Sequence, residues 1–302
     1  MTDPSRRPVQ PWQQWSAAER ERQVSPSSCI GGDYRPFVQA YVDRSRAASA
    51  QAQALGGRWS AWCYGPEPSQ RLDLCLPPGA GPQATVPLLV YVHGGYWQEL
   101  SAQESLFAAG ECIAAGAAFA ALDYTLAPAA TVADIVVECC AALKLLARNG
   151  PAQGIDARRI VIAGSSAGAH LAAMMGQNPG EACRGVVLVS PVTELEPLIG
   201  TTVNGALGLD ASSARASSPA LLPLEGFPPA VIAWGEQETD WFKSMGQGLC
   251  DRLSSIGSPC DAFEVPGRNH FDVVLDLLNP ATRLGQATRR LLGCALWPAG
   301  GQ

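Results

Sequence analysis

The segment RIVIAGSSAGAHLAAM, residues 159–174, decides the expected fold. It opens with a short apolar run, passes through a G-x-S-x-G motif centred on Ser166, and continues into an alanine-rich stretch. A buried strand that enters a helix through such a motif is typical of a nucleophile elbow, in which a tight turn lifts the serine oxygen above the sheet. Gly164 and Gly168 are needed because a Cβ at either position would collide with the turn.

The motif points to Ser166 as a catalytic nucleophile. Ser165 is the obvious rival, but it lacks the flanking glycine spacing. The N-terminus of the helix that follows directs its dipole toward negative charge developing on a substrate oxygen. A glycine-rich turn without activity is the plain alternative.

Around this segment, short apolar runs alternate with helical patterns. The apolar runs fit strands buried on both faces of a parallel sheet, and they lie at residues 87–92, 117–122, 160–163, 186–189 and 230–233, with a weaker strand at 262–265. The helical patterns lie at residues 101–115, 132–147, 166–175, 240–256 and 283–292. This alternation predicts an α/β fold with a mostly parallel central sheet flanked by helices.

The first part of the chain has a different pattern. Pro4, Pro8 and Pro11 disfavour helix at the start, whereas residues 34–53 are helix-like. Two strand candidates at residues 58–64 and 71–76 suit an antiparallel sheet edge. We expect an N-terminal extension over residues 1–57, either a lid over the site or a surface helix. One catalytic domain is expected over residues 58–298.

Composition excludes several classes of function. The 302 residues carry 21 basic and 27 acidic side chains, a net charge of −6, so a nucleic-acid partner is not expected. No apolar stretch approaches the roughly 18 residues that span a bilayer.

The ten cysteines are scattered without a C-x-x-C pair, and the first 16 residues lack the apolar core of a signal peptide. We therefore expect no zinc site, free thiols and a cytoplasmic location.

A second chemical signal, HGGYW at residues 93–97, directly follows the apolar run 87–92. Its two glycines allow backbone N–H groups to turn toward an oxygen and form an oxyanion hole together with the amide of Ala167. The imidazole of His93 is expected to hold this loop in shape.

The catalytic base must be His93, His170 or His270, since the chain has three histidines. His270 follows the last predicted strand, which agrees with the order serine, acid, histidine expected of this fold. His170 lies on the helix after the elbow and is expected to pack there.

The acid should follow the run 230–233, because it must orient the imidazole and stabilise the imidazolium. Spacing leaves Glu236, Glu238 and Asp240 open, with Glu194 more remote, and Asp240 has a competing role at the start of a helix.

Together these motifs resemble the kynurenine formamidase (arylformamidase) branch of the α/β-hydrolase superfamily. In H-G-G-x-W the final tryptophan distinguishes that branch from H-G-G-G esterases. The resemblance spans most of residues 58–295 and is carried by segments 93–97, 164–171, 190–197, 202–204, 218–219, 238–242 and 269–271. It is fainter at residues 25–26 and 34–48.

The resemblance implies a catalytic triad of Ser166, Glu238 and His270, although the family acid is often aspartate. It also implies oxyanion amides from Gly95, Tyr96 and Ala167, and no cofactor. The expected activity is hydrolysis of an aryl formamide similar to N-formylkynurenine through an acyl-enzyme intermediate. A carboxylesterase for small aryl or short-chain esters is the alternative, and an inactive binding protein of the same fold is a remote one.

Four aromatic side chains flank the predicted site and are candidates for an aryl-binding pocket: Tyr96, Trp97, Trp241 and Phe271. Packing of Trp97 and Phe271 against the sheet is the alternative role for those two. The expected partner is a small-molecule acyl or formyl aryl substrate.

Overall fold

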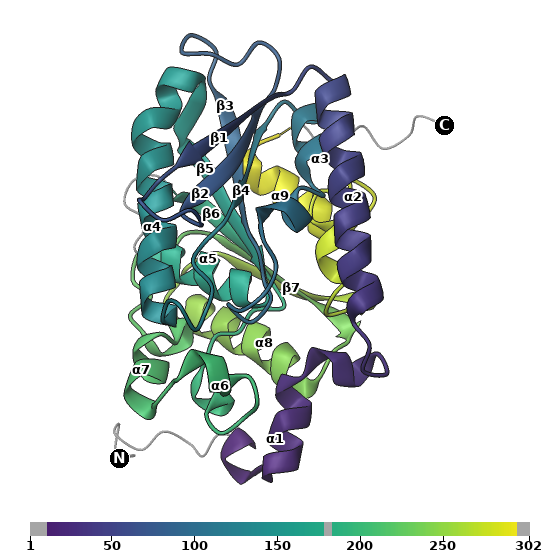
Figure 1. Cartoon of the computed structure of the whole chain (residues 1–302), viewed down its shortest axis with the longest axis vertical. Helices are drawn as coiled ribbons and strands as arrows, with labels where there is room; N and C mark the ends of the chain where they lie inside the picture. The colour runs from purple at the N-terminus through teal and green to yellow at the C-terminus, as the bar shows by residue number, and fades with distance from the viewer. Residues whose placement is uncertain (1–10, 178–182, 295–302) are drawn as a thin grey trace.

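The computed structural model describes residues 11–177 and 183–294, in which one eight-stranded sheet has the order β1-β2-β4-β3-β5-β6-β7-β8. The sheet crosses the molecule with helices on both faces (Figure 1). The strands are β1 Arg58–Cys63, β2 Arg71–Leu76, β3 Val86–Val92, β4 Ala118–Leu122, β5 Ile155–Ser165, β6 Cys183–Val189, β7 Ala230–Gln237 and β8 Cys260–Asn269.

Strands β3 to β8 pair in parallel, whereas β1 pairs with β2, and β2 with β4, in antiparallel fashion. The predicted mostly parallel sheet with an antiparallel edge is therefore confirmed. In open α/β sheets, ligands bind beyond the carboxyl ends of the parallel strands. The loops that leave β3, β5, β6, β7 and β8 share that edge.

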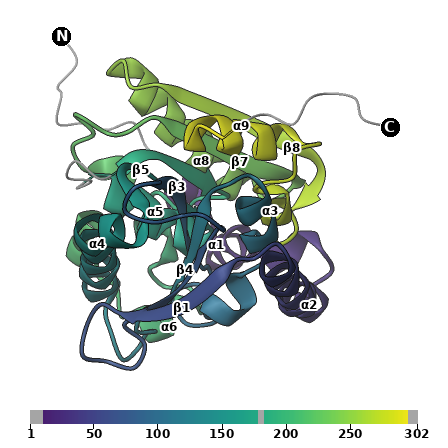
Figure 2. The same cartoon turned by 90° about the horizontal axis from the view of Figure 1, so that it is seen from above.

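Two helical layers cover the sheet. Helices α4 (Val132–Asn149), α5 (Ala167–Gln177) and α8 (Asp240–Ser255) pack in one apolar core cluster, and α3 (Ala109–Ala114), α9 (Arg283–Leu292) and part of α2 (Arg35–Ala54) pack in the other. Figures 1 and 2 show α4 and α2 on opposite sides. The remaining helices are α1 (Ala17–Val24), α6 (Asn204–Leu207) and α7 (Ala211–Ala216).

The two cores follow from strand periodicity, because successive side chains of a strand point to opposite faces. In β3, Leu88 and Val90 enter the core beneath α4 and α5, whereas Leu89 and Tyr91 enter the core beneath α3. All four are buried, so the uniformly apolar run is explained by a strand covered on both faces. No helix in the two described ranges is long and apolar enough to cross a membrane.

The prediction of one helix over residues 101–115 is wrong. A short 3-10 helix at Ala102–Ser105 is followed by an interruption before α3 begins. The carboxylate of Asp123 accepts the Ala102 N–H at 2.6 Å, and the hydroxyl of Ser45 accepts the Leu106 N–H at 3.0 Å. These side chains take up backbone donors that a continuous helix would use internally.

The expectation of a non-helical start is wrong for residues 17–24, which form α1. Ser16 caps this helix, since its hydroxyl accepts the Glu19 N–H at 3.1 Å. Pro4 and Pro8 lie outside the described residues. So does residue 298, the predicted end of the catalytic domain.

Close packing fixes the turn between β5 and α5. A Cβ on Gly164 would overlap the carbonyl oxygen of Gly168, and a Cβ on Gly168 would overlap the carbonyl oxygens of Val92 and His93. The helix therefore lies against the ends of β3 and β5 at a distance that only glycine permits.

We predict that Gly164→Ala lowers the free energy of unfolding by about 1–3 kcal/mol or more, because backbone atoms must move to admit the methyl group. Gly248→Ala is the matched control. Gly248 lies within α8, and a Cβ there would meet no atom within 4 Å, so this change should stabilise by about 0.5–1 kcal/mol. Urea unfolding measures both. Equal stabilities for the two variants would contradict the packing argument.

Candidate active site

Ser166 occupies the turn between β5, which ends at Ser165, and α5, which begins at Ala167. Its φ angle is 57°, a left-handed conformation that costs a non-glycine residue roughly 1–3 kcal/mol. The Ser166 N–H donates to the carbonyl oxygen of Val189 at 2.9 Å, which ties the turn to the end of β6. The side chain also lines a cavity at this edge of the sheet. This is the geometry expected of a nucleophile elbow.

The loop after β3 lies against this turn. A Cβ on Gly94 would lie 2.8 Å from the carbonyl oxygen of Ser165, so the two segments touch directly. Within the described residues, the backbone N–H groups of Gly95, Tyr96 and Ala167 donate to no protein acceptor. Gly95 and Tyr96 also line the cavity. Ala167 is buried and is not among the lining residues. The role of the three amides as an oxyanion hole stays a prediction.

The imidazole of His93 lies beneath the loop. Its Nδ1 lies 3.0 Å from the carbonyl oxygen of Gly94. The Tyr124 ring stacks on it with centroids 4.1 Å apart, and the Tyr124 hydroxyl donates to the carbonyl oxygens of His93 and Gly94. These contacts hold the shape of the loop, the role expected for His93.

His270 and Glu238 meet beside the elbow. The His270 Nδ1 lies 2.9 Å from Oε2 of Glu238, and both residues are buried. Because an ionised carboxylate only accepts, Nδ1 carries the proton and Nε2 is left as the basic nitrogen. The other carboxylate oxygen of Glu238, Oε1, accepts the Gly235 N–H and the Ser190 hydroxyl, each at 2.6 Å.

The other carboxylates considered from spacing lie elsewhere. Glu236 is exposed and accepts the Gly267 N–H at 2.8 Å. Asp240 is exposed on the first turn of α8. Among the described residues, Glu238 is the carboxylate that accepts a hydrogen bond from His270. Its catalytic role stays a prediction, as does that of His270.

Ser166 and His270 line one cavity of about 400 Å³. No hydrogen bond joins their side chains in the described structure; such contacts are often long in ligand-free enzymes and shorten when substrate binds. The cavity lies at the carboxyl edge of the parallel strands, where this fold binds ligands.

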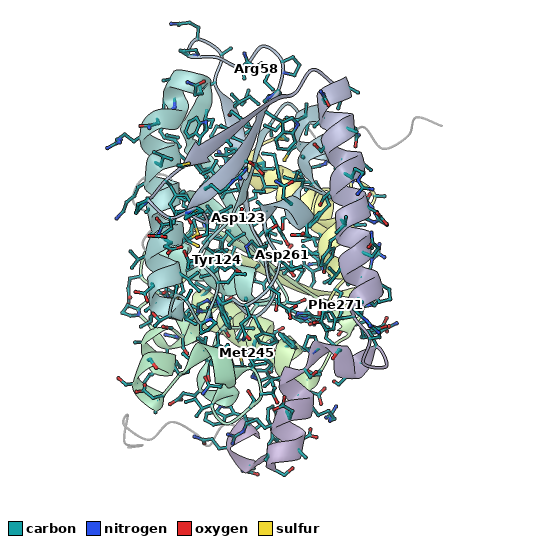
Figure 3. All side chains as sticks on the ribbon, in the orientation of Figure 1. Arg58, Asp123, Tyr124, Met245, Asp261 and Phe271 are labelled. Carbon is teal, nitrogen blue, oxygen red and sulfur yellow. The ribbon has the colours of Figure 1, made fainter. Side chains whose placement is uncertain are left out.

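The N-terminal segment forms part of the cavity wall. Val24, Tyr34 and Tyr41 belong to the lining. The Tyr96 hydroxyl donates to the carbonyl oxygen of Val24, and the Tyr41 hydroxyl donates to that of Phe271. The Tyr34 ring also stacks on Phe271, which lies beside α2 (Figure 3). These residues therefore contact both the loop after β3 and the loop that carries His270.

Two of the four predicted aromatic binding residues line the cavity, namely Tyr96 and Phe271. The prediction is wrong for Trp97 and Trp241, which are 0% and 1% exposed and are not among the lining residues. Trp97 has a positive φ, and its ring lies edge-on to that of His170 with the centroids 5.0 Å apart. Trp241 packs edge-on against Phe242 within the core.

Residue-by-residue reasoning missed the contributions of Ser190 and Val24. Ser190 directly follows the predicted strand at 186–189, so its place at the carboxyl edge was a usable signal. Val24 reaches the site only through the path of the N-terminal segment, which no local motif specifies. Tyr41 lies on the helical segment considered as a lid, and it lines the cavity. Within the described ranges, no group of three or more His, Cys, Asp or Glu side chains is arranged to hold a metal ion.

Comparisons with known proteins agree with this fold. The profile of the alpha/beta hydrolase fold family matches residues 89–273. Kynurenine formamidase of Danio rerio is 26% identical over 93% of this chain and 98% of its own length. Carboxylesterase NlhH of Mycobacterium tuberculosis is 28% identical over 68% of this chain and 72% of its own. A provisionally assigned thioesterase from Silicibacter sp. TM1040 has a TM-score of 0.76 and 26% identity, covering 89% of this chain and 98% of its own.

The two other histidines are uncharged near neutral pH. Burial lowers the pKa of His93 to about 4, and burial does the same for His170, whose Nε2 contacts the carbonyl oxygen of Ser217. Since the unfolded chain protonates them near the ordinary value of 6.5, it binds more protons than the folded chain between about pH 6.5 and 4.

We predict that the free energy of unfolding falls as the pH is lowered through this window, by up to about 1.4 kcal/mol per pH unit for each histidine. Urea unfolding at several pH values measures the fall. In parallel, NMR signals of the His93 and His170 rings should stay constant from pH 8 to about 5.5. A titration of either ring with a midpoint near its ordinary pKa would contradict the prediction.

Proposed function

The chain belongs to the alpha/beta hydrolase fold family, and on that premise we propose that it is a serine hydrolase that cleaves aryl formamides similar to N-formylkynurenine. The observation that carries the proposal is the contact of Glu238 with His270 at the cavity that Ser166 also lines. This arrangement has the parts of an acyl-transfer site: a nucleophile, a base and a group that orients the base.

In the proposed mechanism, Nε2 of His270 takes the proton of the Ser166 hydroxyl while Oγ attacks the formyl carbon. The oxygen of the tetrahedral intermediate accepts hydrogen bonds from the amides of Gly95, Tyr96 and Ala167. His270 then passes its proton to the leaving amine nitrogen, and the carbon–nitrogen bond breaks. A water molecule, deprotonated by the same imidazole, then attacks the formyl ester. The bond from the formyl carbon to Oγ of Ser166 breaks, Oγ takes the proton back from His270, and formate is released.

Within this mechanism, Glu238 keeps the imidazole in the tautomer that leaves Nε2 free, and it stabilises the imidazolium that forms after proton transfer. The hydrogen bonds from Ser190 and Gly235 occupy its other oxygen. No step requires a cofactor.

The cavity lining supports an aryl substrate. The rings of Tyr34, Tyr96 and Phe271 border the space beside Ser166 and offer surfaces on which an aromatic group can pack. Relatives named as formamidase and as carboxylesterase share the catalytic chemistry, since acyl transfer to serine serves amides and esters alike. Hydrolysis of small aryl esters is therefore the second candidate function.

The charges of the lining favour some substrates over others. Glu21, Glu99 and Glu104 line the cavity, and its described lining includes no lysine or arginine. N-formylkynurenine carries both an ammonium and a carboxylate group; these three glutamates attract the ammonium group and disfavour the carboxylate. We extend the proposal to a cytoplasmic location, to a catalytic domain that begins at residue 58, and to an N-terminal extension that covers the cavity as a lid.

We predict that Glu238→Gln lowers kcat about 10²- to 10⁴-fold, because a neutral amide no longer fixes the imidazole tautomer. The matched controls are Asp240→Asn and Glu236→Gln, which remove a charge nearby without touching His270 and should change kcat less than about threefold. Hydrolysis of p-nitrophenyl acetate measures all three. Loss of activity in Asp240→Asn with Glu238→Gln still active would reject Glu238 as the acid.

We also predict that N-formylkynurenine is cleaved to formate with a higher kcat/KM than p-nitrophenyl acetate is cleaved to acetate. Formate release and nitrophenolate absorbance measure the two reactions, and Ser166→Ala should abolish both. An enzyme that cleaves only the ester would be a carboxylesterase, and the formamidase proposal would then be rejected.

A further inference from the structure

We propose that Ser190 is a positioning residue for the triad acid: its hydroxyl holds Glu238 so that one carboxylate oxygen always faces His270. This inference rests on the proposed function, because it assigns Ser190 a part in that same hydrolytic site. Ser190 is not among the catalytic, oxyanion-hole or substrate-binding residues predicted from the sequence.

The position of Ser190 links the nucleophile to the acid. It directly follows β6, where the preceding residue, Val189, accepts the Ser166 N–H at 2.9 Å. Toward the neighbouring strand β7, the Ser190 N–H donates to the carbonyl oxygen of Ala233 at 2.7 Å. Since β7 leads into the loop of Glu238, consecutive residues at the end of β6 contact the chain segments of both catalytic groups.

The backbone of Ser190 is strained. Its φ angle is 48°, in the left-handed region that a non-glycine residue occupies at a cost of roughly 1–3 kcal/mol. The residue is fully buried at 0% exposure. Glycine would relieve the strain but would lack the hydroxyl, which donates to Oε1 of Glu238 at 2.6 Å. The hydroxyl is thus the feature that glycine cannot supply at this position.

The two carboxylate oxygens of Glu238 have different hydrogen-bond partners. Oε1 accepts two donors, the Gly235 N–H and the Ser190 hydroxyl, whereas Oε2 accepts His270. With both donors in place, rotation of the carboxylate breaks contacts at Oε1, so Oε2 stays directed at the imidazole. Without the hydroxyl, one backbone bond remains at Oε1 and the orientation of the imidazole is less defined.

The experiment compares the single variants Ser190→Ala, Ser190→Gly and Glu238→Gln with the double variant Ser190→Ala/Glu238→Gln. Both Ser190 variants remove the hydroxyl, but glycine also relieves the strained backbone, which separates the two effects. We expect each to lower kcat about 10- to 100-fold with KM changed less than about twofold, because substrate binding is untouched. In the Glu238→Gln background, adding Ser190→Ala should cost less than about twofold, because the hydroxyl acts through the carboxylate.

Ser218→Ala is the matched control. Ser218 is equally buried at 0% exposure, and its hydroxyl bonds backbone groups of Leu195 and Ala214. This variant should keep kcat within about twofold of the parent. Thermal unfolding of every variant identifies any that fail to fold, and the less strained Ser190→Gly provides the test if Ser190→Ala is one of them.

A spectroscopic measurement is independent of turnover. The proton on Nδ1 of His270 gives a downfield NMR signal that depends on its hydrogen bond to Glu238, and we expect this signal to shift in Ser190→Gly and to stay in place in Ser218→Ala.

The inference is overturned if folded Ser190 variants keep the parent kcat, if their losses multiply with that of Glu238→Gln, or if the signal does not move. A parent enzyme that hydrolyses neither formamides nor esters would reject the proposed function instead, and the NMR signal would still decide whether Ser190 positions Glu238.

Discussion

The hydrogen bond between His270 and Glu238 is the interaction on which the rest of the site depends. It joins the loop after β7 to the end of β8, and both residues are buried. A buried carboxylate is costly unless its oxygens are hydrogen bonded, and here Ser190, Gly235 and His270 supply the donors. The imidazole consequently has one fixed nitrogen and one nitrogen free for chemistry at the cavity.

Strain is concentrated at the same edge of the sheet. Non-glycine residues with positive φ in the described chain gather in the loop after β3 and at the ends of β5 and β6, and they are Tyr96, Trp97, Leu100, Ser166 and Ser190. Such conformations persist only where the surrounding structure determines them. The parallel sheet and its two helical layers provide that support, since the carboxyl-terminal halves of β3, β5 and β6 are buried. The energy of packing thus holds the backbone of the site in shape before any substrate binds.

Much of the fold was predictable because the signals were local. A buried strand, a G-x-S-x-G turn and an alanine-rich helix adjoin in sequence, so Ser166 could be placed from residues 159–174 alone. The acid could not be placed from spacing, because Glu236, Glu238 and Asp240 lie within five residues at the end of β7 and the start of α8. Only the tertiary contact with His270 distinguishes Glu238 from the other two. Trp97 could not be placed from the sequence, because three consecutive residues, Gly95, Tyr96 and Trp97, have positive φ angles and no regular side-chain periodicity applies to this loop. The cavity wall formed by α1 and α2 depends on contacts between residues far apart in the sequence, such as Tyr41 with Phe271.

Covalent labelling of the active serine tests directly whether Ser166 is the nucleophile. A fluorophosphonate reacts covalently with an activated serine, and peptide mass spectrometry then identifies the modified residue. We predict one adduct per chain, located on Ser166, formed slowly or not at all in Glu238→Gln. An adduct on Ser165, or no adduct on the parent protein, would contradict the assignment of Ser166 as the nucleophile.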